Sequence, residues 1–486
     1  MKKLQFLAWP KLCTAALLGA GALFMASCAK DELSGDSFNG TYGGYQLSAP
    51  NASSISVTKS SDRLNQTITW NTVNGALSYI VNVSRQWDDN EEVVVDDKVV
   101  RGNSITIPRK SMSKYTVSIR TAYNEAEQNT GSTTAAEYKW EINELELNIP
   151  TGTNFAEYFK DETIAQKSKG HPMLIFLEPG GQYTMTESLD MTGVEVSIIG
   201  NDAGNKSVIT LGENSEGTAA SFYTDSPLAL ENVEINFNLS EGSNGKPMIL
   251  LNTTPTCEAI NSYYRIESIS LNNVKVNNLK NSIFYDNNTK YCVVDLRISN
   301  SILKLATTEV KNDALISFQS GGAKDFTVEN STIYGNNAVA KYFLRYQNGA
   351  RIDRYGFTED DTWSFTYQNN TFYGLLKEDG QWGNYDGIVG KPAQGVVTIN
   401  KNIWYNCDLQ TMRRMLKQTK FAAFTGVYKM ADNTFWRDGG AVDQEEYTNK
   451  SEITTEPMFV APAEGDFTLN ACEQMTKGCG DPRWIK

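Results

Sequence analysis

The chain has 486 residues, and its 44 Lys and Arg side chains are outnumbered by 57 Asp and Glu, which gives a net charge of −13. A chain this acidic is a poor partner for nucleic acid. It carries a single histidine, His171, which excludes Ser-His-Asp catalysis and metal centres built on several histidines.

The first 27 residues are typical of a secretory signal that ends in a lipoprotein cleavage site. Two lysines precede an apolar run from Ala15 to Met25, and small residues stand immediately before Cys28. The run is too short for an ordinary transmembrane helix. We therefore expect residues 1–27 to be removed and Cys28 to be lipidated. Residues 28–47, rich in Gly, Ser and Asn, are expected to form a flexible tether.

Removal of this signal makes the chain more acidic. The segment carries three of the 44 basic residues and no acidic one, so 41 basic residues face 57 acidic ones and the net charge becomes −16. The sequence AKDE after the lipidated cysteine resembles the acidic signal that directs Bacteroidota lipoproteins to the outer face of the outer membrane. This resemblance implies a lipid-anchored protein that faces the cell exterior.

Residues 48–140 have the alternating pattern of a β-sandwich. One pair of predicted strands carries Trp70 and Tyr79, and a second pair carries Tyr115. The segment resembles a fibronectin type III domain, in which Trp70 and Tyr79 take the places of core aromatics and Tyr115 that of the corner tyrosine. This resemblance implies a spacer or a binding adaptor.

A helix is expected at the start of the next domain, which we place at residues 141–486. The segment 154–167 begins with an Asn N-cap and places three aromatic residues on one side: Phe155, Tyr158 and Phe159. It would cover an otherwise open sheet edge. The apolar stretches 171–185 and 194–211 then predict the first two coils of a solenoid.

The remainder of this domain repeats one phrase. Two apolar residues stand two apart, a polar anchor follows two residues later, and a third apolar residue follows three after that. The anchors are spaced 27 to 41 residues apart and are Asn232, Asn273, Asn300, Asn330, Asn369, Lys401 and Asp432. A repeat of about this length indicates a solenoid.

Each phrase predicts a strand, a sharp bend at the anchor and a second strand, which together make one coil of a right-handed parallel β-helix. Asn tolerates the left-handed backbone that such a bend needs. We expect the stacked Asn side chains to bond to one another and to satisfy polar groups that point inward. Antiparallel hairpins with Asn-rich turns are the alternative, but hairpins have no reason to keep this spacing seven times.

The chain closes on GDFTL (465–469) and GDPRW (480–484). With the lipoprotein signal, the fibronectin-like module and the β-helix, these motifs resemble pectate-lyase-like β-helix lipoproteins encoded in Bacteroidota polysaccharide-utilisation loci. The resemblance implies work on a polysaccharide at the cell surface, most commonly a pectin-type glycan, alongside an outer-membrane glycan-uptake complex. Cys472 and Cys479, near this end, are close enough in sequence to pair.

Candidate ligand residues lie on the strand that precedes the bend strand in each coil. If Leu251, Tyr285, Phe318 and Tyr346 point inward, alternation turns their successors outward beside Arg345. This predicted polar row contains Asn252, Asp286, Gln319, Arg345 and Gln347. It holds one acid, whereas a Ca²⁺ site needs several oxygen ligands. The row therefore favours a hydrogen-bonding glycan face, and a plain solvated sheet face is the alternative.

Two insertions and one stripe add further candidates. In the loop 349–363, Arg351 and Arg354 could bind uronate carboxylates, or could pair with acids of the same loop. A second insertion offers Trp382 and Tyr385 for stacking on sugars, or as a buried plug. Four residues past the last anchors stands an aromatic stripe that either binds sugar or is covered by loops or the chain end: Tyr334, Tyr373, Tyr405 and Trp436.

We interpret the sequence as an outer-membrane surface lipoprotein that binds an acidic, pectin-type polysaccharide without a metal or another cofactor. The alternative is a pectate-lyase-like enzyme that would use Arg351 or Arg354 as its base together with Ca²⁺. A structural adhesin built from the same modules is a third possibility.

The lipid anchor gives the first testable prediction. Cys28→Ala removes the thiol that would be acylated, so the protein should leave the membrane fraction and become soluble. Membrane fractionation and protease treatment of whole cells measure this. Unchanged fractionation and accessibility in the variant would show that the anchor assignment is wrong.

Overall fold

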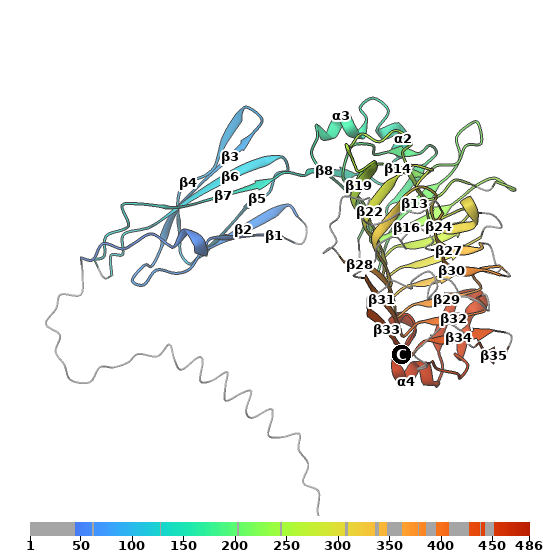
Figure 1. Ribbon diagram of the computed structural model, residues 1–486. Helices are drawn as coiled ribbons and strands as arrows, with labels where there is room; N and C mark the ends of the chain where they lie inside the picture. The colour runs from blue at the N-terminus through green and yellow to red at the C-terminus, as the bar shows by residue number, and fades with distance from the viewer. Residues whose placement is uncertain are drawn as a thin grey trace, which may run out of the picture. The chain divides into compact units, whose positions relative to one another are not determined.

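The computed structural model of the chain is all-β, as predicted, and separates after Trp140 into two compact units (Figure 1). It describes the residues 44–60, 63–126, 128–201, 204–243, 245–306, 310–335, 340–347, 362–377, 379–384, 395–407, 427–437, 439–442 and 452–486.

The first unit consists of two antiparallel sheets. One has the order β1 (Ser56–Lys59), β2 (Asn65–Thr69), β5 (Ser104–Pro108), and the other has β4 (Asn90–Val100), β3 (Tyr79–Trp87), β6 (Ser113–Thr121), β7 (Ala136–Ile142). Trp70 and Tyr79 are buried between them in edge-to-face contact, with ring centroids 5.4 Å apart. Burial alternates along β3 and β6, as in a strand with one face in a core. The fibronectin type III assignment itself stays a prediction.

The second unit is a parallel β-helix with three long sheets. The first sheet contains β8 (Leu145–Ile149), β9 (Met173–Leu177), β12 (Val196–Ile199), β15 (Leu228–Glu231), β19 (Tyr263–Asn272), β22 (Tyr291–Ser299), β25 (Gly322–Glu329), β28 (Trp363–Gln368), β31 (Gly395–Asn400) and β33 (Val427–Ala431). The second sheet contains β10 (Gln182–Met185), β13 (Ser207–Leu211), β16 (Val233–Phe237), β20 (Lys275–Leu279), β23 (Ile302–Leu305), β26 (Thr332–Tyr334), β29 (Thr371–Tyr373), β32 (Ile403–Tyr405) and β34 (Thr434–Arg437), with β35 (Gly440–Ala441) at its edge.

The third sheet contains β11 (Leu189–Asp190), β14 (Phe222–Thr224), β17 (Ile249–Leu251), β21 (Phe284–Tyr285), β24 (Ala314–Phe318), β27 (Tyr342–Tyr346) and β30 (Gln381–Asn384). From β9 to β30, the chain passes through the first, second and third sheets in turn. Equivalent residues pair from coil to coil, so one interior column of the first sheet runs through Ile198, Leu230, Leu271, Ile298 and Val328. Such columns make the continuous apolar core.

The bend between the first and second sheets is where the repeated phrase predicted it. All seven anchors have left-handed backbone, with φ between 48° and 58°: Asn232, Asn273, Asn300, Asn330, Asn369, Lys401 and Asp432. Asn300 and Asn330 lie in adjacent coils, since the Asn300 amide donates to Glu329 O at 3.1 Å. The anchors therefore act through their backbone conformation, which explains why Lys and Asp replace Asn in the last two coils.

The expected bonding between stacked anchors is confirmed for one pair, because Asn273 Nδ2 donates to Asn232 Oδ1 at 2.8 Å. A second, buried ladder that was not predicted starts one residue after the anchors. The anchor side chains lie at the surface or are half-buried, whereas the next residues are fully buried: Ser301, Ser331, Asn370, Asn402 and Asn433. Asn370 Nδ2 donates to Asn402 Oδ1 at 2.9 Å, and Asn402 Nδ2 donates to Asn433 Oδ1 at 3.0 Å. The bend turns the residue after the anchor inward, which the sequence interpretation did not take into account.

The expected single helix is two short helices, α2 (Phe155–Tyr158) and α3 (Ile164–Ser168). Asn154 caps the first as predicted, and Thr163 caps the second. Of the three aromatics, Phe155 and Phe159 are buried whereas Tyr158 is exposed. Strand β8 precedes the helices and pairs with β9, an element that the sequence analysis missed. No helix in the described part of the chain is long and apolar enough to cross a membrane.

The buried ladder generates a second prediction. Asn402→Leu removes the acceptor of the Asn370 amide and leaves buried polar groups unpaired, which should cost roughly 1–3 kcal/mol of unfolding free energy for each group. Asn300→Gly is the matched control because glycine keeps the left-handed backbone at an exposed anchor. Denaturant unfolding should show a large loss for the first variant and a small one for the control. Equal losses would contradict the ladder.

Candidate ligand-binding face

The outer side of the third sheet carries a continuous row of side chains. Pairing from strand to strand aligns Asp190, Tyr223, Leu250, Tyr285, Ser317 and Arg345. Of the predicted row, only Arg345 lies in this register, while Asn252, Gln319 and Gln347 lie two residues beyond it. The inward places predicted for Leu251, Phe318 and Tyr346 are confirmed, since all three are buried. The role of the row in binding stays a prediction.

Asp286 is a correction to the predicted row, because its side chain is completely buried. Tyr285, which was expected to point inward, takes the outward place. The strand β21 has only two residues, so a turn begins at Asp286 at once, and a slip of one residue exchanges the two faces of a strand. The Asp286 carboxylate accepts the backbone N–H groups of Asn288, Ser320 and Gly321 at 2.7–3.1 Å. The buried carboxylate therefore holds the loop after β21 and the loop after β24 together, and it is not exposed to a ligand.

A short loop organises the polar groups of this face. The 3-10 turn η2 (Lys311–Asp313) holds Asn312 and Asp313 in left-handed backbone. Asn312 Nδ2 donates to Ser317 Oγ at 3.2 Å and to Gln319 Oε1 at 3.0 Å. Gln319 Oε1 also accepts the Tyr285 hydroxyl at 2.8 Å. The loop thereby fixes one side of the Gln319 amide and leaves its nitrogen without an acceptor among the described residues.

Arg345 is held by the same loop. Its Nη1 donates to the Asn312 carbonyl at 2.6 Å, and its guanidinium carbon lies 4.7 Å from the ring centroid of Tyr342. The Nε atom is buried and has no acceptor among the described residues. The buried Nε is out of a ligand's reach, but Nη2 donates to none of the described residues, and a guanidinium fixed on a tyrosine ring with that donor unused suits a ligand carboxylate.

Asn252 and Gln347 mark the two ends of the predicted row. Asn252 is buried; it accepts the Tyr223 hydroxyl at 2.7 Å and donates to Thr192 Oγ1 at 3.1 Å. Its amide thus holds the turn that follows, and its role is structural in this arrangement. Gln347 is exposed at the other end, beyond Arg345.

Trp382 is a second correction, because it is completely buried in the solenoid interior. Its ring stacks on Phe343 with centroids 4.2 Å apart and meets Trp404 edge to face at 5.6 Å. The plug alternative is therefore the correct one, and Trp382 stacks on no sugar. Arg351, Arg354 and Tyr385 lie outside the described residues.

The predicted aromatic stripe exists on the second sheet, where register aligns Tyr334, Tyr373, Tyr405 and Trp436. A hairpin near the chain end covers it. Phe467 lies 5.1 Å from Tyr334 and 5.5 Å from Tyr373, and Phe459 lies 5.6 Å from Tyr405, measured between ring centroids. Burial and the neighbouring Glu456 raise the pKa of Tyr405 to about 12. The stripe is an internal interface rather than a ligand surface.

Potential catalytic and redox groups are few in the described part of the chain. No group of three His, Cys, Asp or Glu side chains there is placed to hold a metal ion. His171 Nδ1 lies 2.7 Å from Asn143 Oδ1, away from the third sheet's row. Cys472 and Cys479 are free thiols and do not form the pair that their spacing allowed.

Three family models match successive parts of the chain, and each describes a domain of unknown function. The first, DUF4992, matches residues 3–175, the second, DUF4957, matches 181–336, and the third, DUF5123, matches 326–484. A comparison with curated proteins finds no match.

Solved structures of pectate lyases are among those to which the chain is similar. Pectate lyase PelI from Erwinia chrysanthemi in complex with tetragalacturonic acid is 11% identical, with 85% of this chain and 98% of that chain covered, at a TM-score of 0.18. Pectate lyase Pel3 from Pectobacterium carotovorum is 10% identical over 83% and 97%, at 0.20. Scores of this size do not superimpose one site on another, so no residue role is transferred.

The buried Asp286 predicts a pH dependence. Burial raises the pKa of this carboxyl from 3.8 to about 6, although backbone N–H groups oppose the shift. Because the folded-state pKa is the higher one, the proton stabilises the fold below about pH 4, and this stabilisation is lost as pH rises through about 6. The loss should reach about 3 kcal/mol.

Asp286→Asn removes this titration and leaves every other group in place. We expect the unfolding free energy of the wild type, minus that of the variant, to fall between pH 4 and pH 7. Urea unfolding at several pH values measures the difference. Parallel pH curves for the two proteins would contradict the raised pKa.

Proposed function

We propose that this protein binds an acidic polysaccharide, of pectin type, on the outer face of the third sheet. The observation that carries the proposal is Arg345. The Asn312 loop and the Tyr342 ring fix its guanidinium, and part of its hydrogen-bonding capacity is unused. A fixed guanidinium matches the planar carboxylate of a uronate sugar.

The charge around Arg345 supports an anionic ligand. Lys311 belongs to the Asn312 loop, the Lys341 ammonium lies 5.8 Å from the Tyr342 ring centroid, and Lys377 pairs with Asp313 at 2.7 Å. A mature chain with a net charge of −16 repels anions at long range. A local group of basic side chains is therefore needed for any acidic glycan to bind.

The Gln319 amide completes the face, and the hydroxyl of the buried Tyr285 helps to orient it. Sugar hydroxyls take hydrogen bonds from side-chain amides, and the Gln319 nitrogen is oriented by the bonds that its oxygen accepts. Arg351 and Arg354, from the insertion that follows β27, are proposed as further carboxylate partners. Neighbouring strands are about 4.8 Å apart, so contacts on successive coils would follow an extended glycan chain.

The remaining parts of the chain fit a display role. We propose that Cys28 carries a lipid anchor on the outer membrane and that residues 28–47 form a tether. The sandwich at residues 48–140 would serve as a fibronectin type III-like spacer. Placed at the cell surface, the β-helix would capture glycan for an uptake system. A lyase that uses Ca²⁺ is the competing proposal, which the same experiment tests.

The binding proposal predicts that Arg345→Gln and Gln319→Ala weaken retardation of the protein in polygalacturonate gels by tenfold or more. Added salt should weaken wild-type binding in the same direction, because it screens the carboxylate–guanidinium attraction. Gln368→Ala, an exposed glutamine on the first sheet, is the matched control and should bind like wild type.

Ultraviolet absorbance of the same mixtures separates binding from cleavage. A binding protein leaves absorbance constant, whereas a lyase generates unsaturated products, which the double variant Arg351→Ala with Arg354→Ala would abolish. Unaltered affinity in Arg345→Gln and Gln319→Ala would remove this face from the site. Circular dichroism of each variant checks that the fold is kept, because Arg345→Gln and Gln319→Ala also remove hydrogen bonds to Asn312 and Tyr285.

A further inference from the structure

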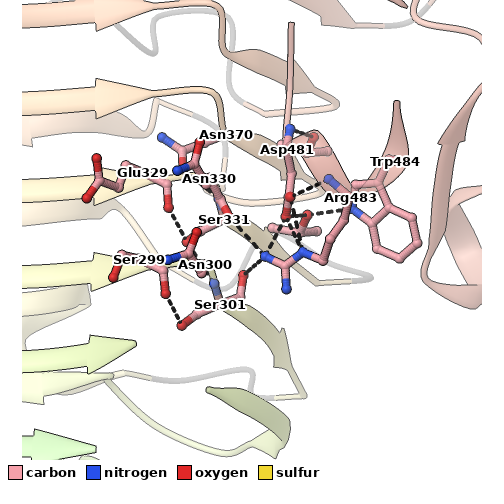
Figure 2. A network of polar contacts seen from close by, with 12 residues as sticks. Ser299, Asn300, Ser301, Glu329, Asn330, Ser331, Asn370, Asp481, Arg483 and Trp484 are labelled. Carbon is pink, nitrogen blue, oxygen red and sulfur yellow. Dashed lines mark hydrogen bonds and ion pairs between the residues drawn. The ribbon is translucent and has the colours of Figure 1, made fainter. Parts of the chain in front are cut away.

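The last residues of the chain run back along the solenoid. The segment 452–486 contains β36 (Phe459–Ala461), η4 (Pro462–Glu464), β37 (Asp466–Leu469), α4 (Glu473–Lys477) and η5 (Pro482–Trp484). It begins beside the last coil, where the Ile453 amide donates to Asn433 O at 2.8 Å. Figure 2 shows Arg483 of the final residues beside Ser301 and Asn330, which stand at the ends of β22 and β25, several coils before the last one.

The contacts of this segment advance by about one coil at a time. At the last coil, Gln474 Nε2 donates to Thr434 Oγ1 at 3.2 Å. At the next coil, the Gly480 amide donates to Lys401 O at 2.7 Å. At the third, the Asp481 amide donates to Thr371 Oγ1 at 3.1 Å.

The residues from Asp481 to Trp484 bond to two further coils (Figure 2). Thr332 Oγ1 donates to Asp481 Oδ2 at 2.8 Å and accepts Trp484 Nε1 at 2.8 Å. Arg483 Nη2 donates to the carbonyl oxygens of Asn330 at 2.8 Å and Ser301 at 3.2 Å. The segment thus bonds to β34, the β31–β32 bend, β29, β26 and the β22–β23 bend, which belong to five successive coils.

The residue types of the motif explain its fit. Gly480 has φ +87°, and a Cβ there would lie 2.9 Å from both Thr371 Oγ1 and Ile403 Cδ1, so the position requires glycine. Asp481 is 1% exposed and pairs with Arg483 at 2.9 Å while it also caps η5. A buried carboxylate needs such a partner, and the pair is fixed between the second sheet and the chain end.

Apolar contacts reinforce the same path. Leu469 and Cys479 are buried against Ile403, and Phe467 joins the stripe tyrosines to Trp484, whose ring centroid is 6.0 Å away. A segment that merely closed the end of a solenoid would contact the last coil alone. This segment instead lies along the outer side of the second sheet.

We propose that the segment 452–486 is an intramolecular clamp that makes the five coils from β22–β23 to β34 unfold as one cooperative unit. In a solenoid without such a segment, the free energy of unfolding is the sum of each coil's own stability and of the contacts between neighbouring coils. The end coils then unfold separately from the rest. The clamp couples coils that are not neighbours. It is independent of the glycan proposal, because its contacts lie on a different sheet.

Native-state hydrogen exchange in the full mature protein tests the clamp. Thr332→Val keeps the shape of the sheet residue but removes the hydroxyl that donates to Asp481 Oδ2 and accepts Trp484 Nε1, while the Asp481–Arg483 pair remains. Gly480→Ala disturbs the clamp from its own side. In both variants we expect amides of β26, β29, β32 and β34 to exchange together, about tenfold faster or more, with β9 and β12 unchanged.

Lys477→Ala is the matched control, since it removes only half-exposed ion pairs with Asp432 and Glu473. Its exchange should stay within about twofold of wild type. Faster exchange confined to β26 in Thr332→Val, or to the coil that contacts residue 480 in Gly480→Ala, would overturn the clamp. Unchanged exchange in both variants would overturn it as well. If Gly480→Ala fails to fold, Thr332→Val alone decides between these outcomes.

Discussion

The β-helix depends on one left-handed residue per repeated phrase, placed where the chain leaves the first sheet for the second. That residue reverses the direction in which side chains point, so its successor enters the core. The buried successors then bond to the backbone N–H of the coil before: Asn402 Oδ1 accepts the Asn370 amide, and Asn433 Oδ1 accepts the Asn402 amide. Polar groups that a sharp bend would leave unpaired in the core are satisfied in this way. Register between coils follows, because the ladder fits in one alignment only.

The sequence predicts this part of the fold because the constraint is local and repeats. The phrase around each anchor identifies the bend even at Lys401 and Asp432, where Asn is absent. The identity of the inward residue is harder to predict, because it depends on how far the bend rotates the chain. Ser301 and Asn402 follow their anchors and repeat at the same spacing, so the repeat alone does not show which of the two adjacent positions points inward. The break at residues 159–163, which divides the expected helix into two, is likewise a local feature that the sequence pattern did not predict.

Predictions for the third sheet were less accurate for a physical reason. Its strands are short and follow loops of different lengths, so no repeated phrase fixes their phase. A slip of one residue at β21 was enough to exchange Tyr285, which aligns with the outward row although it is buried, with Asp286, which holds two loops from inside. The sequence did not predict that Asn312 holds Gln319 and Arg345 in place. This role depends on two successive residues with left-handed backbone in a loop that does not repeat. Trp382 could be assigned to the core only once Phe343 was known to lie against it.

The two outer faces of the β-helix that carry aromatic side chains differ in which residues pack against those side chains. On the second sheet, the tyrosine stripe meets Phe459 and Phe467, which come from the chain end. On the third sheet, Tyr285 and Tyr342 meet polar and basic groups of nearby coils: Gln319, Asn312 and Arg345. An aromatic ring packed on other rings serves stability, whereas a ring beside an incompletely bonded guanidinium offers a place for a ligand oxygen. The rings of the third sheet are themselves buried, so the ligand contacts that we propose on that face are made by the polar and basic groups beside them rather than by exposed rings.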